Sequence, residues 1–116
     1  MSVTIYHNPR CSKSRQTLAL LEDRGAAPQV VHYLETPPDA ATLERILGLL
    51  GLGARDLMRR KEAPYKELGL AEPGLAEAEL IRAMVENPIL IERPIVVAGE
   101  RAAIGRPPEA VLDILP

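Results

Sequence analysis

The fold of this chain is decided by residues 3–21, VTIYHNPRCSKSRQTLALL. Its first four residues, Val3-Thr4-Ile5-Tyr6, are β-branched or apolar and predict a strand. Asn8-Pro9 interrupts that strand, and Ser12-Lys13-Ser14-Arg15 begins a helix whose apolar residues follow at helical spacing. Cys11, the only cysteine of the sequence, therefore stands where a strand ends and a helix begins.

This position suits Cys11 to nucleophilic chemistry. A thiol at the first turn of a helix meets backbone N–H groups that have no helical partner, together with the positive end of the helix dipole, and both stabilise a thiolate. The competing interpretation is a buried free thiol that packs as a small apolar residue. The polar neighbours Arg10, Ser12 and Lys13 disfavour that interpretation, so Cys11 is a candidate nucleophile.

Two nearby side chains are candidates for supporting the thiolate. His7 ends the first strand, and a protonated imidazole there would stabilise a negative sulfur; a plain hydrogen-bonding role at the strand end is the alternative. Ser14 lies one helical turn after Cys11 and could donate a hydrogen bond to the sulfur. Its alternative role is ordinary capping of the helix.

A lowered thiol pKa is not enough for catalysis. A cysteine with a pKa near 8.5 is roughly 3% thiolate at pH 7. Lowering the pKa by about two units raises the thiolate fraction roughly 25-fold, while nucleophilicity falls roughly eightfold. Because the net gain is only a few-fold, other groups must hold and polarise the substrate.

Composition excludes several classes of protein. The 116 residues predict one domain, 47% of them are hydrophobic and the net charge is −2, which argues against a nucleic-acid binder. No apolar run reaches the roughly 20 residues of a membrane span, and the first residues do not form a signal peptide. One cysteine and two histidines argue against an internal disulfide and a closed metal site. We expect a cytoplasmic protein without a metal or a membrane partner.

The element order indicates the fold class. The sequence predicts strand 2–7, helix 12–24, strand 29–34, a helix from Pro37-Pro38-Asp39 to Gly51, a short basic helix 54–61, a brief turn at 64–69, helix 77–87, a hairpin of 94–98 with 101–104, and a last helix from Pro107. A βαβ unit followed by ββα is the order of the thioredoxin-like α/β fold with a mixed four-stranded sheet. We expect a single domain over residues 1–116, with a helical insertion at about 38–87.

Three arginines are candidates for binding an anion near Cys11. Arg93 precedes Pro94 at the start of a strand, and Arg106 follows Gly105 before a helix. In a thioredoxin-like fold both places lie near the active-site turn, and the proline before the third strand is usually cis. Arg59 belongs to the predicted basic helix. A guanidinium suits an oxyanion because it stays charged and donates two hydrogen bonds in fixed geometry; a solvated surface charge is the alternative for each.

Several motifs resemble one known family. They are Tyr6-His7-Asn8-Pro9-Arg10-Cys11, Arg59, Pro64-Tyr65, Leu68-Gly69-Leu70, Asn87-Pro88-Ile89-Leu90, Glu92-Arg93-Pro94-Ile95-Val96-Val97 and Gly105-Arg106-Pro107. In order and with few gaps, these residues resemble the glutaredoxin-linked arsenate reductases. The sequence ends at Pro116, so the resemblance is to the short-chain branch of that family.

The resemblance implies a function. Cys11 would attack arsenate or a related oxyanion, and Arg59, Arg93 and Arg106 would bind that anion. Glutathione would be a co-substrate rather than a bound cofactor, and glutaredoxin would remove the resulting mixed disulfide. Relatives that use an internal dithiol need a second cysteine, whereas the third residue after Cys11 is Ser14.

Two other functions remain open at this point. The first is a general glutathione-dependent reductase of thiols and mixed disulfides, which would need Cys11 but not all three arginines. The second is a regulator resembling the Spx proteins, which share this fold and bind RNA polymerase. Spx proteins usually carry a Cys-x-x-Cys switch, which Cys11-Ser12-Lys13-Ser14 lacks.

Overall fold

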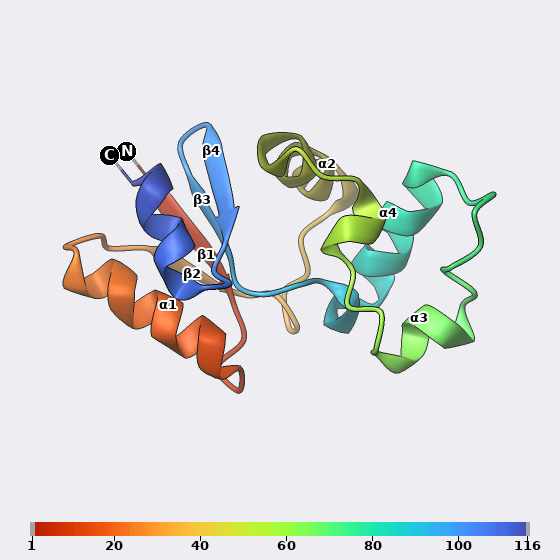
Figure 1. Cartoon of the computed structure of the whole chain (residues 1–116), viewed down its shortest axis with the longest axis horizontal. Coiled ribbons are helices and arrows are strands. Elements are labelled where there is room, and N and C mark those ends of the chain that lie inside the picture. Colours follow the sequence, from red (N-terminus) through yellow and green to blue (C-terminus); the bar gives the residue numbers. More distant parts are fainter. Residues whose placement is uncertain (1, 116) are drawn as a thin grey trace. The chain divides into compact units, whose positions relative to one another are not determined.

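A computed structural model describes residues 2–115 of the chain (Figure 1). Its contacts divide the chain into two compact units, residues 2–36 with 93–115 and residues 37–92. The predicted helical insertion, about 38–87, falls within the second unit. In the described part of the chain, no helix is both long and apolar enough to cross a bilayer.

The first unit is built on a mixed four-stranded sheet. Its strands are β1 (Val3–His7), β2 (Gln29–His32), β3 (Ile95–Ala98) and β4 (Arg101–Ile104). They lie in the order β2-β1-β3-β4; β2 is parallel to β1, and β3 is antiparallel to both β1 and β4. The thioredoxin-like fold class predicted from the sequence is confirmed.

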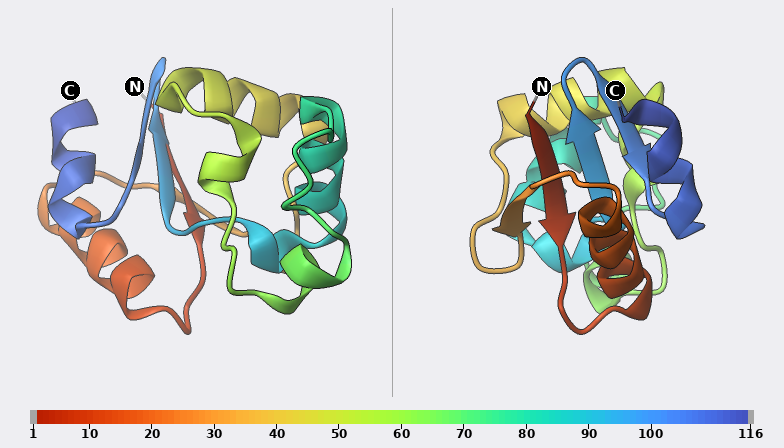
Figure 2. Two further views of the ribbon diagram at one scale, coloured as in Figure 1. Left: turned by 45° about the vertical axis from the view of Figure 1, so that its right-hand side comes forward. Right: turned by 90° about the vertical axis from the view of Figure 1, so that its left-hand side faces the viewer.

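One face of this sheet carries the core of the first unit. Helix α1 (Ser12–Asp23) and the 3₁₀ helix η3 (Pro108–Ile114) both pack on that face (Figure 2). The buried core residues come from β1, α1, β3 and η3: Val3, Ile5, Leu21, Val96, Ala98, Val111 and Ile114. Burial of these apolar side chains fixes α1, and with it Cys11, against the sheet.

The second unit is helical. It contains α2 (Ala40–Leu50), the 3₁₀ helix η1 (Ala54–Leu57), α3 (Ala63–Glu67), α4 (Glu77–Glu86) and the 3₁₀ helix η2 (Pro88–Leu90). The carboxylate of Asp39 caps α2 by accepting a 2.8 Å hydrogen bond from the Thr42 N–H, and Gly51 ends that helix in the left-handed region, at φ 69°.

The predicted basic helix 54–61 is wrong in its second half. Residues 54–57 form η1, but Met58 is extended and makes a single antiparallel bridge with Ile91. The Arg59 N–H donates to the Leu90 carbonyl at 2.7 Å, and the Glu92 N–H donates to the Leu57 carbonyl at 2.8 Å. Arg59 therefore lies outside the helix, directly after the bridged residue, because pairing with a distant part of the chain replaces the local helix.

Two further boundaries differ from the sequence prediction. The second strand stops at His32 rather than at residue 34, because the His32 carbonyl accepts from the N–H groups of Glu35 and Thr36 and closes a turn there. The last helix, predicted to start at Pro107, begins at Pro108 and is a 3₁₀ helix, in which the Ala110 N–H donates to the carbonyl three residues earlier, that of Pro107.

Candidate active site

The loop between β1 and α1 presents Cys11 at the start of α1. Cys11 is the N-cap residue, with extended backbone angles, and its side chain is partly exposed. Asn8 shapes this loop: its carbonyl accepts from the Cys11 N–H, and its side-chain oxygen accepts from the Arg10 N–H, both at 3.0 Å. The sulfur thus lies at the positive end of a 12-residue helix.

Arg93 and Arg106 are both neighbours of the Cys11 sulfur. The Nη2 of Arg106 lies 3.5 Å from the Sγ of Cys11, and the side chain of Arg93 is also hydrogen-bonded to that sulfur. The Nε of Arg106 donates to the backbone carbonyl of Arg93 at 2.8 Å. Residues that are 95 positions apart in sequence therefore meet at the thiol.

These contacts set the ionisation of the thiol. Burial raises the pKa of Cys11, but hydrogen bonds from the Ser14 backbone, the Arg93 side chain and the Lys13 backbone, with the charge of Arg93, lower it below its ordinary value. All of these groups belong to the first unit. A thiolate stabilised in this way can act as a nucleophile, and guanidinium groups beside it can bind an anion.

Gly105 and Pro94 bring Arg106 to this place. The Arg93–Pro94 peptide bond is cis, as expected for this proline, and so is the Arg106–Pro107 bond. The Gly105 N–H donates to the Pro94 carbonyl at 2.9 Å. A Cβ on Gly105 would collide with the buried Thr17 side chain of α1 and would lie 2.8 Å from the Pro94 ring. Only glycine allows this close approach.

The hydroxyl of Ser14 does not act as predicted. Its backbone supports the sulfur, but its hydroxyl accepts from the Asn8 N–H at 3.0 Å and lies 2.6 Å from Nδ1 of His7. Ser14 and Asn8 are buried. The Ser14 side chain therefore joins the end of β1 to the first turn of α1, and supports the thiol by fixing this loop.

The surroundings of His7 favour the neutral imidazole over the protonated partner that one sequence interpretation proposed. Burial, followed by the nearby charges of His32 and Arg15, lowers the pKa of His7. A neutral imidazole whose ring proton is on Nε2 can accept a hydrogen bond from the Ser14 hydroxyl at Nδ1. The alternative interpretation, hydrogen bonding at the strand end, describes His7 correctly.

Arg59 lies in the second unit, where carboxylates surround it. Its Nε is 3.1 Å from Oε2 of Glu62, and its Nη1 is 2.8 Å from Oε1 of Glu92. Burial lowers the pKa of Arg59, but hydrogen bonds and charges from Glu62 and Glu92 outweigh this and raise it. The assignment of Arg59 to the anion site stays a prediction.

Sequence reasoning missed three contributors to the thiol site. Asn8 and Gly105 shape the backbone, and the Arg93 carbonyl orients Arg106. The Asn8-Pro9 break indicated a turn but not its hydrogen bonds. A glycine directly before Arg106 was the one sequence signal for the role of Gly105. The need for glycine at this position comes from its contact with Thr17, which depends on tertiary packing.

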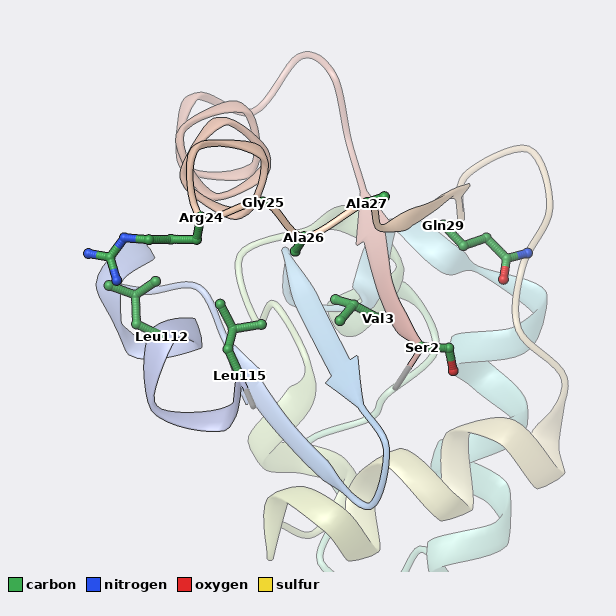
Figure 3. Close-up of a pocket in the computed structure, with 9 residues that line it drawn as sticks. All are labelled: Ser2, Val3, Arg24, Gly25, Ala26, Ala27, Gln29, Leu112 and Leu115. Carbon is green, nitrogen blue, oxygen red and sulfur yellow. The ribbon is translucent and has the colours of Figure 1, made fainter.

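A separate cavity of about 570 Å³ lies in the first unit, where the end of α1, the start of β2 and η3 meet (Figure 3). Arg24, Leu112 and Leu115 are among its lining residues, and none of the predicted site residues lines it.

Comparison with known proteins places this site in a family. A model of the ArsC family matches residues 6–114. A protein of Escherichia coli (strain K12), "Uncharacterized protein YfgD", is 64% identical over 114 residues, which are 97% of this chain and 96% of that protein. An arsenate reductase of Neisseria meningitidis serogroup A is 54% identical over 114 residues, 97% of each chain. The structure of an arsenate reductase from Vibrio cholerae matches with a TM-score of 0.96 at 59% identity, covering 99% of this chain and 98% of that one.

The family model and these relatives agree, and the chain belongs to the ArsC family.

Proposed function

We propose that this protein reduces arsenate to arsenite, with Cys11 as the nucleophile and glutathione and glutaredoxin as the reductants. The observation that carries the proposal is the thiol of Cys11 at the start of α1, with Arg106 Nη2 at 3.5 Å and Arg93 hydrogen-bonded to the same sulfur. The naming of similar proteins as arsenate reductases supports the choice of substrate.

The first step forms a bond between sulfur and arsenic. The Cys11 thiolate attacks As(V), an As–O bond breaks, and the oxygen leaves as water after taking up protons. Arg93 and Arg106 bind the arsenate oxygens and stabilise the negative charge that grows during the attack. The sulfur electron pair forms the S–As bond and the departing oxygen keeps the electron pair of the broken As–O bond, so arsenic remains As(V).

The second step reduces arsenic. The thiolate of glutathione attacks the Cys11 sulfur, an S–S bond forms, and the S–As bond breaks with its electron pair left on arsenic, which leaves as arsenite. A glutaredoxin thiolate then attacks the glutathione sulfur and releases the Cys11 thiolate. One cysteine in the sequence supports this external route, and its thiol reductants suit a cytoplasmic, reducing compartment.

Arg59 is proposed as the third guanidinium of the anion site. Its support is the family resemblance together with the contacts that hold the side chain within the second unit, to Glu62 and Glu92. The expected contribution of Arg59 is to the binding of the oxyanion rather than to the ionisation of Cys11, because the groups that lower the thiol pKa all belong to the first unit.

The test is arsenite formation by the purified protein with glutathione and glutaredoxin. We expect turnover that requires both reductants and falls at least about 1000-fold in Cys11→Ser, because the nucleophile is lost. No arsenite at any practical arsenate concentration would reject the proposal. Reduction of a glutathione mixed disulfide that survives loss of both Arg59 and Arg106 would instead favour a general thiol–disulfide reductase.

A further inference from the structure

Another cavity of the first unit lies where its two parallel strands end. Strands β1 and β2 run in the same direction, and the last pair in their register is His7 with His32. Their carboxyl ends therefore meet at one edge of the sheet, which is where open α/β sheets generally bind ligands. The cavity at this edge has a volume of about 230 Å³ and is lined by residues 7–10 and by His32, Leu34 and Glu35.

The buried side of this cavity is held in place by hydrogen bonds. His7 and Asn8 are only 5% and 7% exposed. The Ser14 hydroxyl joins them, because it accepts from the Asn8 N–H at 3.0 Å and lies 2.6 Å from Nδ1 of His7. The rings of His7 and His32 meet edge to face, with 5.9 Å between their centroids. These packed and bonded groups form the cavity before any ligand arrives.

Two exposed residues of opposite charge line the same cavity. Arg10 comes from the loop after β1, where its N–H donates to the Asn8 side chain at 3.0 Å. Glu35 comes from the turn after β2, where its N–H donates to the His32 carbonyl at 3.0 Å. A cavity with one cation and one carboxylate suits a zwitterionic group, because each charge of the ligand can form a charge-assisted hydrogen bond.

The cavity adjoins the nucleophile. Arg10 immediately precedes Cys11, and the Cys11 N–H donates at 3.0 Å to the carbonyl of Asn8, which also lines the cavity. An extended peptide spans roughly 3.5 Å per residue. A peptide whose terminal group occupies the cavity can therefore bring its next residue to the Cys11 sulfur.

We infer that this cavity binds the γ-glutamyl end of glutathione, with Arg10 on its carboxylate and Glu35 on its ammonium group. The inference rests on the proposed function, because it takes glutathione to be the reductant that meets Cys11. It adds a binding site for that reductant, at the ends of β1 and β2, to the arginines proposed to bind the oxyanion.

The γ-glutamyl group matches the cavity in charge and in size. It ends in an α-amino acid, with an ammonium and a carboxylate on one carbon, whereas the glycine end of glutathione has a carboxylate alone. A volume of about 230 Å³ is below the roughly 300–1,000 Å³ of sites for whole drug-sized ligands, which suits one end of the tripeptide. The γ-peptide link then leads out to the glutathione cysteine.

Formation of a mixed disulfide with oxidised glutathione tests this site without arsenate. The Cys11 thiolate attacks one sulfur of oxidised glutathione and forms a new S–S bond, and the old S–S bond breaks with its electron pair on the departing glutathione thiolate. Cys11 is oxidised and the departing sulfur is reduced. The rate, measured by mass spectrometry at constant ionic strength, is divided by the rate with bis(2-hydroxyethyl) disulfide, an uncharged reagent. Changes in the reactivity of Cys11 itself cancel in this ratio.

Arg10→Ala should lower the rate ratio at least about fivefold, because a charge-assisted bond to glutathione is lost. Glu35→Gln should also lower it. This direction is decisive: oxidised glutathione carries a net negative charge, so the loss of a nearby carboxylate would raise the ratio if charge attraction alone acted. In turnover, both variants should raise KM for glutathione and leave KM for arsenate unchanged. Both substitutions keep the main-chain bonds of these residues.

Lys13→Gln and Glu109→Gln are the matched controls, because they remove the same two charges. Both residues are exposed and belong to the first unit, and neither lines the cavity. Lys13 lies two residues after Cys11, much as Arg10 lies one residue before it. Each control should keep the ratio within about twofold of the natural one, since exposed charges that do not touch the ligand are screened.

The outcomes separate this inference from the proposed function. A ratio that is unchanged in Arg10→Ala, or unchanged or higher in Glu35→Gln, rejects the glutathione site, while arsenite formation by the natural protein with both reductants would still support the proposed function. If Cys11 of the natural protein reacts with iodoacetamide but not with oxidised glutathione, the site is rejected. If that protein also forms no arsenite, the proposed function is rejected with it.

Discussion

In the first unit the guanidinium of Arg106 lies 3.5 Å from a thiol, whereas in the second unit the guanidinium of Arg59 is bound by two carboxylates. Arginine side chains therefore have different roles in the two units. Beside Cys11, positive charge favours the thiolate and lowers its pKa. Around Arg59 the two carboxylates outweigh the single positive charge of the guanidinium, so these three side chains together do not attract anions by charge alone.

The largest effect on this comparison is expected from Arg93→Ala. Arg93 bonds to the sulfur and is proposed to stabilise charge on the arsenate, so kcat/KM for arsenate should fall about 100- to 1000-fold. Arg93→Lys keeps the charge but not the planar donor pair, and should recover only part of the loss. Steady-state kinetics with both reductants measure this, and an Arg93→Ala enzyme within threefold of the natural one would contradict the assignment.

Arg59→Ala sharpens the difference between the two units. Arg59 is proposed to act on the anion, so KM for arsenate should rise about tenfold or more while the alkylation pKa of Cys11 stays unchanged. Arg93→Ala should change both quantities. Kinetics and a pH series of alkylation rates on the two variants provide the check; a shift of the Cys11 pKa in Arg59→Ala would remove the distinction between the units.

Gly105→Ala tests the packing that places Arg106. The added methyl would collide with Thr17 and Pro94, so we expect a loss of about 1–3 kcal/mol in the free energy of unfolding, together with a higher Cys11 pKa. Gly48→Ala is the control, because Gly48 lies within α2 with nothing within 4 Å of the added atom, and alanine there should stabilise by about 0.5–1 kcal/mol. Urea unfolding compares them, and equal stabilities would show that Gly105 has room.

Ser14→Ala should lower the stability less than Gly105→Ala does. It leaves the Asn8 N–H and the His7 ring without their hydroxyl partner in a buried place, at a cost of about 1–2 kcal/mol in unfolding free energy. Ser12→Ala, at an exposed position of the same helix, should change stability by less than about 0.5 kcal/mol. Indistinguishable urea midpoints for the two variants would mean that the Ser14 bridge contributes nothing.

Much of the first unit could be predicted from the sequence because its signals are local. The β-branched run before Asn8, the helix after Cys11 and the hairpin around Gly99 each specify their own element. The convergence of Arg93 and Arg106 on Cys11 was also predicted, since a thioredoxin-like topology brings those strand and helix ends together.

The errors come from contacts between distant residues. Nothing near Met58 in the sequence indicates its bridge to Ile91, so a helix was predicted where the chain is extended. The sequence suggested a hydrogen bond from the Ser14 hydroxyl to the Cys11 sulfur, because the two residues lie one helical turn apart. In the structure this hydroxyl lies beside His7, seven residues away. A charged His7 was considered because sequence does not reveal burial, which lowers its pKa.

The rate at which iodoacetamide alkylates Cys11, followed from pH 4 to pH 10, tests the central claim most directly. Helix α1, Arg93 and Arg106 should shift the midpoint of this titration below that of the same cysteine in the urea-unfolded protein, whose ordinary value is about 8.5. A midpoint equal to or above that of the unfolded protein would show that neither the helix nor the arginines stabilise the thiolate, and would contradict the account of this site.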